Sequence, residues 1–250
     1  MLLNIDGAFD RAWIAMQRAI ERARALNHPF SLCHALIMAS AFGAVIGDPE
    51  IVAGLVDEVL QITRERGFQS FESQAMVYRG WIMAAASPQD AVEQVNAGLS
   101  LFYRVGMRNV TGWLEMIAGE AMLVAGSLGE ARIHLDHSAA ALTETGEDAM
   151  RPNLQTRVGD LLVAENRLAE AEQVYLAALD FARENQLFSG ELRAGLALGK
   201  LLCSRNRADQ AAVILRDLLN RCEEGFDRPP VRTMRELIAE IDTGVGRRQA

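Results

Sequence analysis

Residues 195–200 read Gly-Leu-Ala-Leu-Gly-Lys and invite comparison with the glycine-rich loop that cradles nucleotide phosphates. The second glycine comes one residue too early for that loop, no Ser or Thr follows Lys200, and no strand pattern precedes the segment. A phosphate-binding loop depends on that strand–loop–helix context. We therefore expect residues 195–200 to be a piece of helical scaffold, without an ATP site at Lys200.

His134 and His137 stand three residues apart in a segment with a helical pattern. This spacing could place two imidazoles on one helix face, as a zinc site requires. The sequence offers no nearby cysteine or acidic cluster that would complete a ligand set. The two histidines are therefore predicted to be packing or surface residues, and neither a metal nor a cofactor is expected.

Glu120 and Asp160 are equivalent in position, since each directly follows a glycine of the helical pattern. Two carboxylates could act as a catalytic acid and base, but that role would require altered pKa values, which a sequence does not reveal. A row of exposed carboxylates on a solvated surface is the more ordinary interpretation. With no serine-elbow motif and no paired-carboxylate signature, the chain is not predicted to be an enzyme.

Small residues recur along the chain with a period of 40, which indicates repeated helical units. In the clearest unit, helices are expected at about 154–164 and 168–184, and small residues would let the two helices approach closely. Segment ends recur at intervals of 39 or 40 residues, most often at a glycine, which can adopt the left-handed conformation that closes a helix. The periodic small residues are Gly119, Gly159 and Gly199, with Ala131, Ala171 and Ala211, and the segment ends are Asn27, Gly67, Gly106, Gly146, Gln186 and Gly225.

The predicted fold is all-α, an α-solenoid of tetratricopeptide-like helical hairpins with a period of about 40 residues. The spacing of Gly159, Ala171, Tyr175 and Ala178 resembles the signature of that repeat. We expect one repeat domain over residues 1–242 and a flexible tail at 243–250. Its parts are a leading helix at 8–26, hairpins at about 28–67, 68–106, 107–146, 147–186 and 187–225, and a terminal helix at 230–242.

The beginning of the chain lacks the first half of a repeat, so an exposed apolar edge is expected near Leu2, Leu3 and Trp13 unless a second copy of the chain covers it. The net charge of −8 argues against non-specific nucleic-acid binding. The sequence also lacks a secretion signal and a membrane-spanning apolar run. Its three cysteines form no disulfide pattern, which favours the cytoplasm.

Four strings lie in order on this repeat frame: "ALNHPFSLCHAL" at 25–36, "YRGW" at 78–81, "GELRAGLALGKLL" at 190–202 and "EEGFDRPPVRTMREL" at 223–237. Together they resemble the C-terminal helical-repeat region of large bacterial signalling ATPases. In those proteins an ATPase module precedes the repeats, and an adenylate cyclase domain or a winged-helix DNA-binding domain precedes the ATPase; "SLCHAL" favours the winged-helix branch. The resemblance implies sensing or protein contact, with any catalysis in domains outside this chain. A free-standing adaptor protein is the alternative, and an enzyme is a remote one.

The resemblance to tetratricopeptide arrays also implies a concave groove lined by the first helix of each hairpin. We expect a protein or peptide partner there, or a small effector. Exposed Trp and Arg are common anchors of such binding. The two tryptophans at groove positions, Trp81 and Trp113, could instead fill the core between repeats. The groove candidates are Trp81, Trp113, Glu120, Asn153, Asp160, Arg193 and Lys200.

Overall fold

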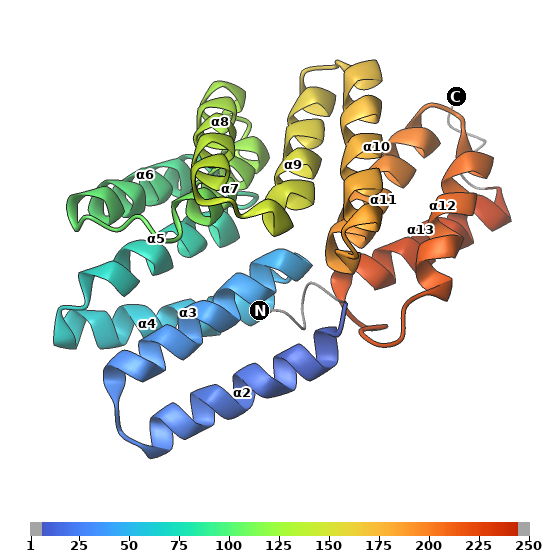
Figure 1. The fold of residues 1–250 in the computed structure, drawn as a ribbon. Helices are drawn as coiled ribbons and strands as arrows, with labels where there is room; N and C mark the ends of the chain where they lie inside the picture. Colours follow the sequence, from blue (N-terminus) through green and yellow to red (C-terminus); the bar gives the residue numbers. More distant parts are fainter. Residues whose placement is uncertain (1–6, 245–250) are drawn as a thin grey trace. The chain divides into compact units, whose positions relative to one another are not determined.

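The computed structural model describes residues 7–244, and within them all regular secondary structure is helical, with no β-strand (Figure 1). This confirms the all-α prediction. Abundant Ala, Leu, Arg and Glu favour helix, while proline stands mainly at helix starts, where its missing N–H costs nothing. None of the described helices is both long and apolar enough to cross a bilayer.

The helices follow one another with short connections. They are α2 (Phe9–Ala25), α3 (Pro29–Ile46), α4 (Pro49–Arg66), α5 (Gln69–Met83), α6 (Pro88–Arg104), α7 (Thr111–Val124), α8 (Leu128–Thr145), the short 3-10 helix η1 (Asp148–Met150), α9 (Arg151–Ala164), α10 (Leu168–Glu184), α11 (Phe188–Ser204), α12 (Ala208–Asn220) and α13 (Pro229–Thr243). Of the predicted tail, Thr243 belongs to α13, and residues 245–250 lie outside the described part.

The described chain divides into two compact units. The N-terminal unit comprises residues 11–146, and the C-terminal unit comprises residues 147–244 together with residues 7–10. The sequence led us to expect one repeat domain over 1–242; the boundary between the units falls at Gly146, one of the periodic segment ends. Each unit is described separately below.

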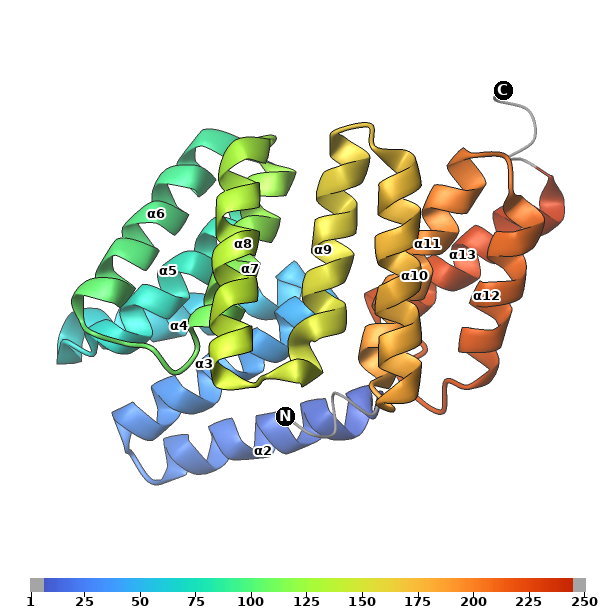
Figure 2. The ribbon, with the colours of Figure 1, turned by 45° about the horizontal axis from the view of Figure 1, so that its top comes forward.

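Within each unit, successive helices pack as hairpins (Figure 2). The N-terminal unit contains the pairs α3·α4, α5·α6 and α7·α8, and the first helices of these pairs contact one another as α3·α5 and α5·α7. The C-terminal unit contains α9·α10 and α11·α12, with the contacts α9·α11 and α11·α13. The first helix of each pair therefore belongs to a row of contacting helices in its own unit.

All six periodic segment ends have a positive φ, between 49° at Asn27 and 76° at Gly225. Five of them lie within two residues of the end of a helix, as predicted, whereas Gly225 lies in the loop five residues beyond the end of α12 at Asn220. A second set of positive φ values marks turns inside the hairpins, at Gly47, Gly126, Asn166 and Asn206. The turn between α5 and α6 has no residue with a positive φ.

The periodic glycines lie where two helices of a pair approach closely, which confirms the prediction made from the small residues. A methyl group on Gly159 would lie 2.3 Å from the Tyr175 ring, and one on Gly119 would lie 2.8 Å from Leu135. The corresponding group on Gly199 would lie 3.0 Å from Leu215. In all three pairs the glycine faces a bulky residue sixteen positions later, so the hairpins share one packing geometry.

The described residues near the predicted open edge at the chain start are partly covered. Phe9 is buried, Asp10 accepts a hydrogen bond from the Gly225 N–H at 2.9 Å, and its carboxylate pairs with Arg228 at 2.9 Å. Trp13 is half-buried and stacks on Phe42, with 5.8 Å between ring centroids. Leu2 and Leu3 lie outside the described residues.

Candidate functional site

Three of the seven groove candidates belong to the N-terminal unit, and all three are half-buried. Trp81 lies on α5, while Trp113 and Glu120 lie on α7. The indole N–H of Trp113 donates to the hydroxyl of buried Tyr78 at 2.7 Å. Trp113 therefore helps to pack α7 on α5, and only part of its surface is left for a partner.

The other four candidates belong to the C-terminal unit. Asn153 has an exposed fraction of 3%, which differs from the groove-facing position expected for it. The carboxylate of Asp160 on α9 accepts a hydrogen bond from the Tyr175 hydroxyl at 2.6 Å and so contributes to the α9–α10 contact. Arg193 is half-buried and Lys200 is exposed, both on α11.

The Gly195–Lys200 segment lies entirely inside α11, which runs from Phe188 to Ser204. Its backbone N–H groups are directed along the helix, so no loop is present there to surround a phosphate. The helical prediction for this segment is confirmed.

Hollows on the N-terminal unit lie along α2, α3 and α4, where Trp13, Leu55 and Ile62 are among the residues that line them.

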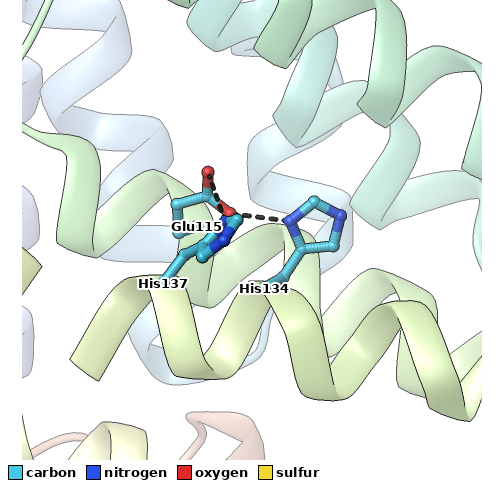
Figure 3. Close-up of side chains that lie close together, drawn as sticks. All are labelled: Glu115, His134 and His137. Atoms are coloured by element: carbon cyan, nitrogen blue, oxygen red, sulfur yellow. Dashed lines mark hydrogen bonds and ion pairs between the residues drawn. The ribbon is translucent and has the colours of Figure 1, made fainter. Parts of the chain in front are cut away.

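The most concentrated chemistry of the N-terminal unit lies between α7 and α8, where Glu115 meets His134 and His137 (Figure 3). The Nδ1 atom of His134 is 2.6 Å from Oε2 of Glu115, and Nδ1 of His137 is 3.9 Å from Oε1. Glu115 has an exposed fraction of 1%. The His134 side chain is 13% exposed and the His137 side chain 62%, so the cluster runs from the interior to the surface.

Tyr103, on α6, adds a fourth group to this cluster, because its hydroxyl donates to Oε1 of Glu115. Burial, followed by the Glu115 carboxylate, raises the pKa of Tyr103 above its usual value near 10. The tyrosine therefore remains a proton donor at every physiological pH. Each Glu115 oxygen thus has a hydrogen-bond partner, and the carboxylate is oriented toward α8.

The donor atoms of Glu115, His134 and His137 lie within 4.8 Å of one another. One carboxylate oxygen and two imidazole nitrogens form a ligand set that suits Zn²⁺ and related transition ions, with coordination positions left for water. The same arrangement orients His134, since a carboxylate beside Nδ1 favours the tautomer with its proton on that nitrogen.

The sequence identified the two histidines but missed Glu115, which lies nineteen residues earlier and on the other helix of the hairpin. The repeat frame contained a signal that would have found it. Gly119 packs on Leu135, so the residue one turn before Gly119 must meet the helix surface next to Leu135, where the histidines lie. The expectation that no nearby cysteine or acidic cluster completes a ligand set overlooked Glu115, which comes close to the histidines only through the packing of α7 on α8.

A buried ion pair in the C-terminal unit is built differently. Glu191 on α11 has an exposed fraction of 1% and accepts two hydrogen bonds from Arg221, at 2.7 and 2.9 Å, and a third from Arg183 at 3.3 Å. The Arg221 guanidinium also lies over the Phe188 ring, 5.0 Å from its centroid. Since Glu191 is paired with two arginines, its role is to join α10, α11 and the end of α12.

None of the known family models matches this sequence, and none of the curated proteins does. The resemblance to the repeat region of bacterial signalling ATPases therefore stays a prediction that rests on the quoted strings.

Proposed function

We propose that the chain is a non-catalytic helical-repeat domain, an α-solenoid of tetratricopeptide-like hairpins, that binds an acidic segment of a partner protein. In this proposal it is the cytoplasmic sensing or interaction part of a bacterial signalling or transcriptional regulator. The observation that carries the proposal is the row of contacting first helices in each unit. The periodic glycines on these helices allow the second helix of each hairpin to pack closely against the row. In solenoid proteins such a row provides an extended binding surface.

The charge on α11 supports an acidic partner. Arg193 and Lys200 are seven residues apart, close to two helical turns, so they lie on the same face of α11 at a separation of about 10 Å. That separation matches roughly three residues of an extended peptide. Lys200 is exposed, and it is the single lysine among 25 basic residues in a chain whose net charge is −8.

Alternative functions have less support. A free-standing adaptor would use the same surface and differ only in lacking an attached output domain. Nucleotide-dependent catalysis is disfavoured because residues 195–200 are helical. Binding of a small effector requires a concave site lined by the candidates, whereas the hollows along α2, α3 and α4 involve other residues.

Selection from a random peptide library displayed on phage tests the proposal. With the full chain immobilised, enriched peptides are expected to be rich in Asp and Glu, and their binding should be lost when Arg193→Glu and Lys200→Glu are combined. The control is Arg232→Glu, a charge reversal of an exposed arginine on α13. Selected peptides without acidic enrichment, or equal binding by all variants, would refute the proposal.

Carbodiimide coupling provides a second readout, because it joins a peptide carboxylate to a nearby amine. Lys200 carries the sole side-chain ammonium of the chain, so a bound acidic peptide is expected to couple there. Lys200→Arg keeps the positive charge and removes the amine. This variant should retain binding and lose coupling; coupling that persists would place the peptide elsewhere.

A further inference from the structure

We propose that Glu115, His134 and His137 form a binding site for a divalent transition-metal ion of the Zn²⁺ type. The site goes beyond the proposed peptide binding, which uses α11 of the C-terminal unit, and is independent of it. Its donors come from both helices of one hairpin: the carboxylate from α7 and the two imidazoles from consecutive turns of α8 (Figure 3). A bound ion would therefore join α7 to α8.

Comparison with the neighbouring repeats shows that the hairpin can close without a carboxylate and two imidazoles at these places. Counted from the periodic glycines, the places of Glu115 and His134 are taken by Gln155 and Val174 in the next unit, and by Gly195 and Ile214 in the one after. A methyl group on Gly195 would lie 3.6 Å from Ile214, so these two places face each other there as well. The third place, that of His137, holds Ala177 and Asp217.

Burial makes a carboxylate at the place of Glu115 costly in free energy unless a ligand is bound. A carboxylate removed from water loses several kcal/mol of hydration, which hydrogen bonds and opposite charge must offset. Glu115 receives hydrogen bonds from Tyr103 and His134, and a divalent cation would add the compensating charge. One neighbouring hairpin closes with Gly195 and Ile214 at the places of Glu115 and His134, so a buried carboxylate beside two imidazoles is best explained by a ligand that needs them.

Binding requires one proton movement. The Nδ1 atom of His134 faces Glu115, and a metal ion can take its lone pair only when that nitrogen carries no proton. Neutral His134 then changes from the Nδ1-protonated to the Nε2-protonated tautomer without net release, whereas an imidazolium releases one proton to solvent. Tyr103 continues to hold the second oxygen of Glu115 and so orients the carboxylate.

His137 offers the route of entry. Its side chain is 62% exposed, and its Nδ1 atom lies 3.9 Å from Glu115, within reach of an ion that the two inner groups already hold. Removing this ring leaves no buried cavity. His137→Ala is therefore the variant that separates metal binding from folding.

Titration of Zn²⁺ into the full chain, followed by calorimetry, tests the proposal. We expect one equivalent to bind to the site, with affinity lowered about tenfold or more by His137→Ala and lowered further by Glu115→Gln. His34→Ala is the matched control, because His34 is an exposed histidine on α3 of the same unit. Affinity should also fall in acid, where imidazole protonation competes with the ion.

Three free cysteines could also take up Zn²⁺, so the calorimetry is repeated with Co²⁺, whose visible spectrum distinguishes thiolate from nitrogen and oxygen ligands. A spectrum without thiolate charge-transfer bands, altered by His137→Ala and unaltered by His34→Ala, supports the site. Absence of binding by the unsubstituted chain, or equal binding by the His137→Ala and His34→Ala variants, overturns it. Circular dichroism of each variant establishes that the helices are intact.

Discussion

Substitution of Gly80 by alanine probes the close approach of helices on which the repeat geometry depends. Gly80 lies on α5 and faces α6, where an added methyl group would lie 2.5 Å from Val95 Cγ2, 2.9 Å from the Ala91 carbonyl oxygen and 3.1 Å from the Val95 nitrogen. Two of these atoms belong to the backbone. Val95 is fully buried and β-branched, so one χ1 rotamer is strongly preferred in the helix and its side chain yields little. The two helices must therefore separate.

Two opposing effects set the size of the change. Alanine is favoured over glycine inside a helix by about 1 kcal/mol, whereas overpacking a buried site costs about 1–3 kcal/mol. Gly54 on α4 provides the reference, since it is exposed and a methyl group there would meet nothing within 4 Å. We expect Gly54→Ala to stabilise the N-terminal unit by up to about 1 kcal/mol and Gly80→Ala to leave it about 1–3 kcal/mol less stable than Gly54→Ala.

Urea unfolding followed by far-ultraviolet circular dichroism measures both variants. Because Gly54 and Gly80 belong to the same compact unit, both should shift the same transition. The difference between their free energies of unfolding isolates the packing contribution, since the helix-propensity gain is common to both. If Gly80→Ala raised the urea midpoint as much as Gly54→Ala, α5 and α6 would not be in close contact at Gly80, and the packing explanation of this glycine would be refuted.

Two further predictions concern charged and titrating groups. Arg221→Gln should lower the free energy of unfolding by about 1–3 kcal/mol, because buried Glu191 loses two charge-assisted hydrogen bonds. The value should lie toward the lower end of this range, because the Arg221 side chain is 44% exposed. Arg205→Gln should cost less than about 1 kcal/mol, because its partner Glu172 keeps Arg207; equal losses in urea unfolding would contradict this. Stability should also fall above a pH of about 10. Burial raises the pKa of every tyrosine in the folded chain, and at two of them a nearby carboxylate raises it further. Above that pH the folded chain therefore keeps phenolic protons that the unfolded chain has lost, which favours unfolding. Combined tyrosinate absorbance and circular dichroism test this, and tyrosinate that forms near a pH of about 10 in a fully helical chain would count against it. The tyrosines are Tyr78, Tyr103 and Tyr175.

Local features of the chain could be predicted from sequence because their causes are local. A left-handed closing residue such as Gly67 or Gly146 ends a helix whatever surrounds it, and proline at a helix start acts within one turn. The repeat spacing also predicted a close approach of two helices at Gly159, and in the structure the Tyr175 ring is the group that packs on this glycine. The all-α fold followed from these rules without any knowledge of long-range contacts.

Side-chain roles were less predictable because burial depends on neighbouring helices. Asn153 and Lys200 both occupy positions assigned to the groove, yet one is buried and the other exposed. Trp113 is half-buried and donates a hydrogen bond to Tyr78. It therefore lies between the two alternatives that the sequence left open, an exposed binding anchor and a core residue. Helical periodicity defines which face a residue lies on, but not which faces the next helix covers.

The sequence by itself determined the helices, their ends and the places where hairpins close tightly, because these depend on backbone preference and on residue size at a regular spacing. Only the tertiary structure decided that Glu115 meets His134 and His137, and that Asp10 pairs with Arg228 across more than two hundred residues. Such contacts depend on how separate helices pack. The free energy of packing is shared among many side chains, so the sequence near the contacting residues has no pattern that predicts the contact.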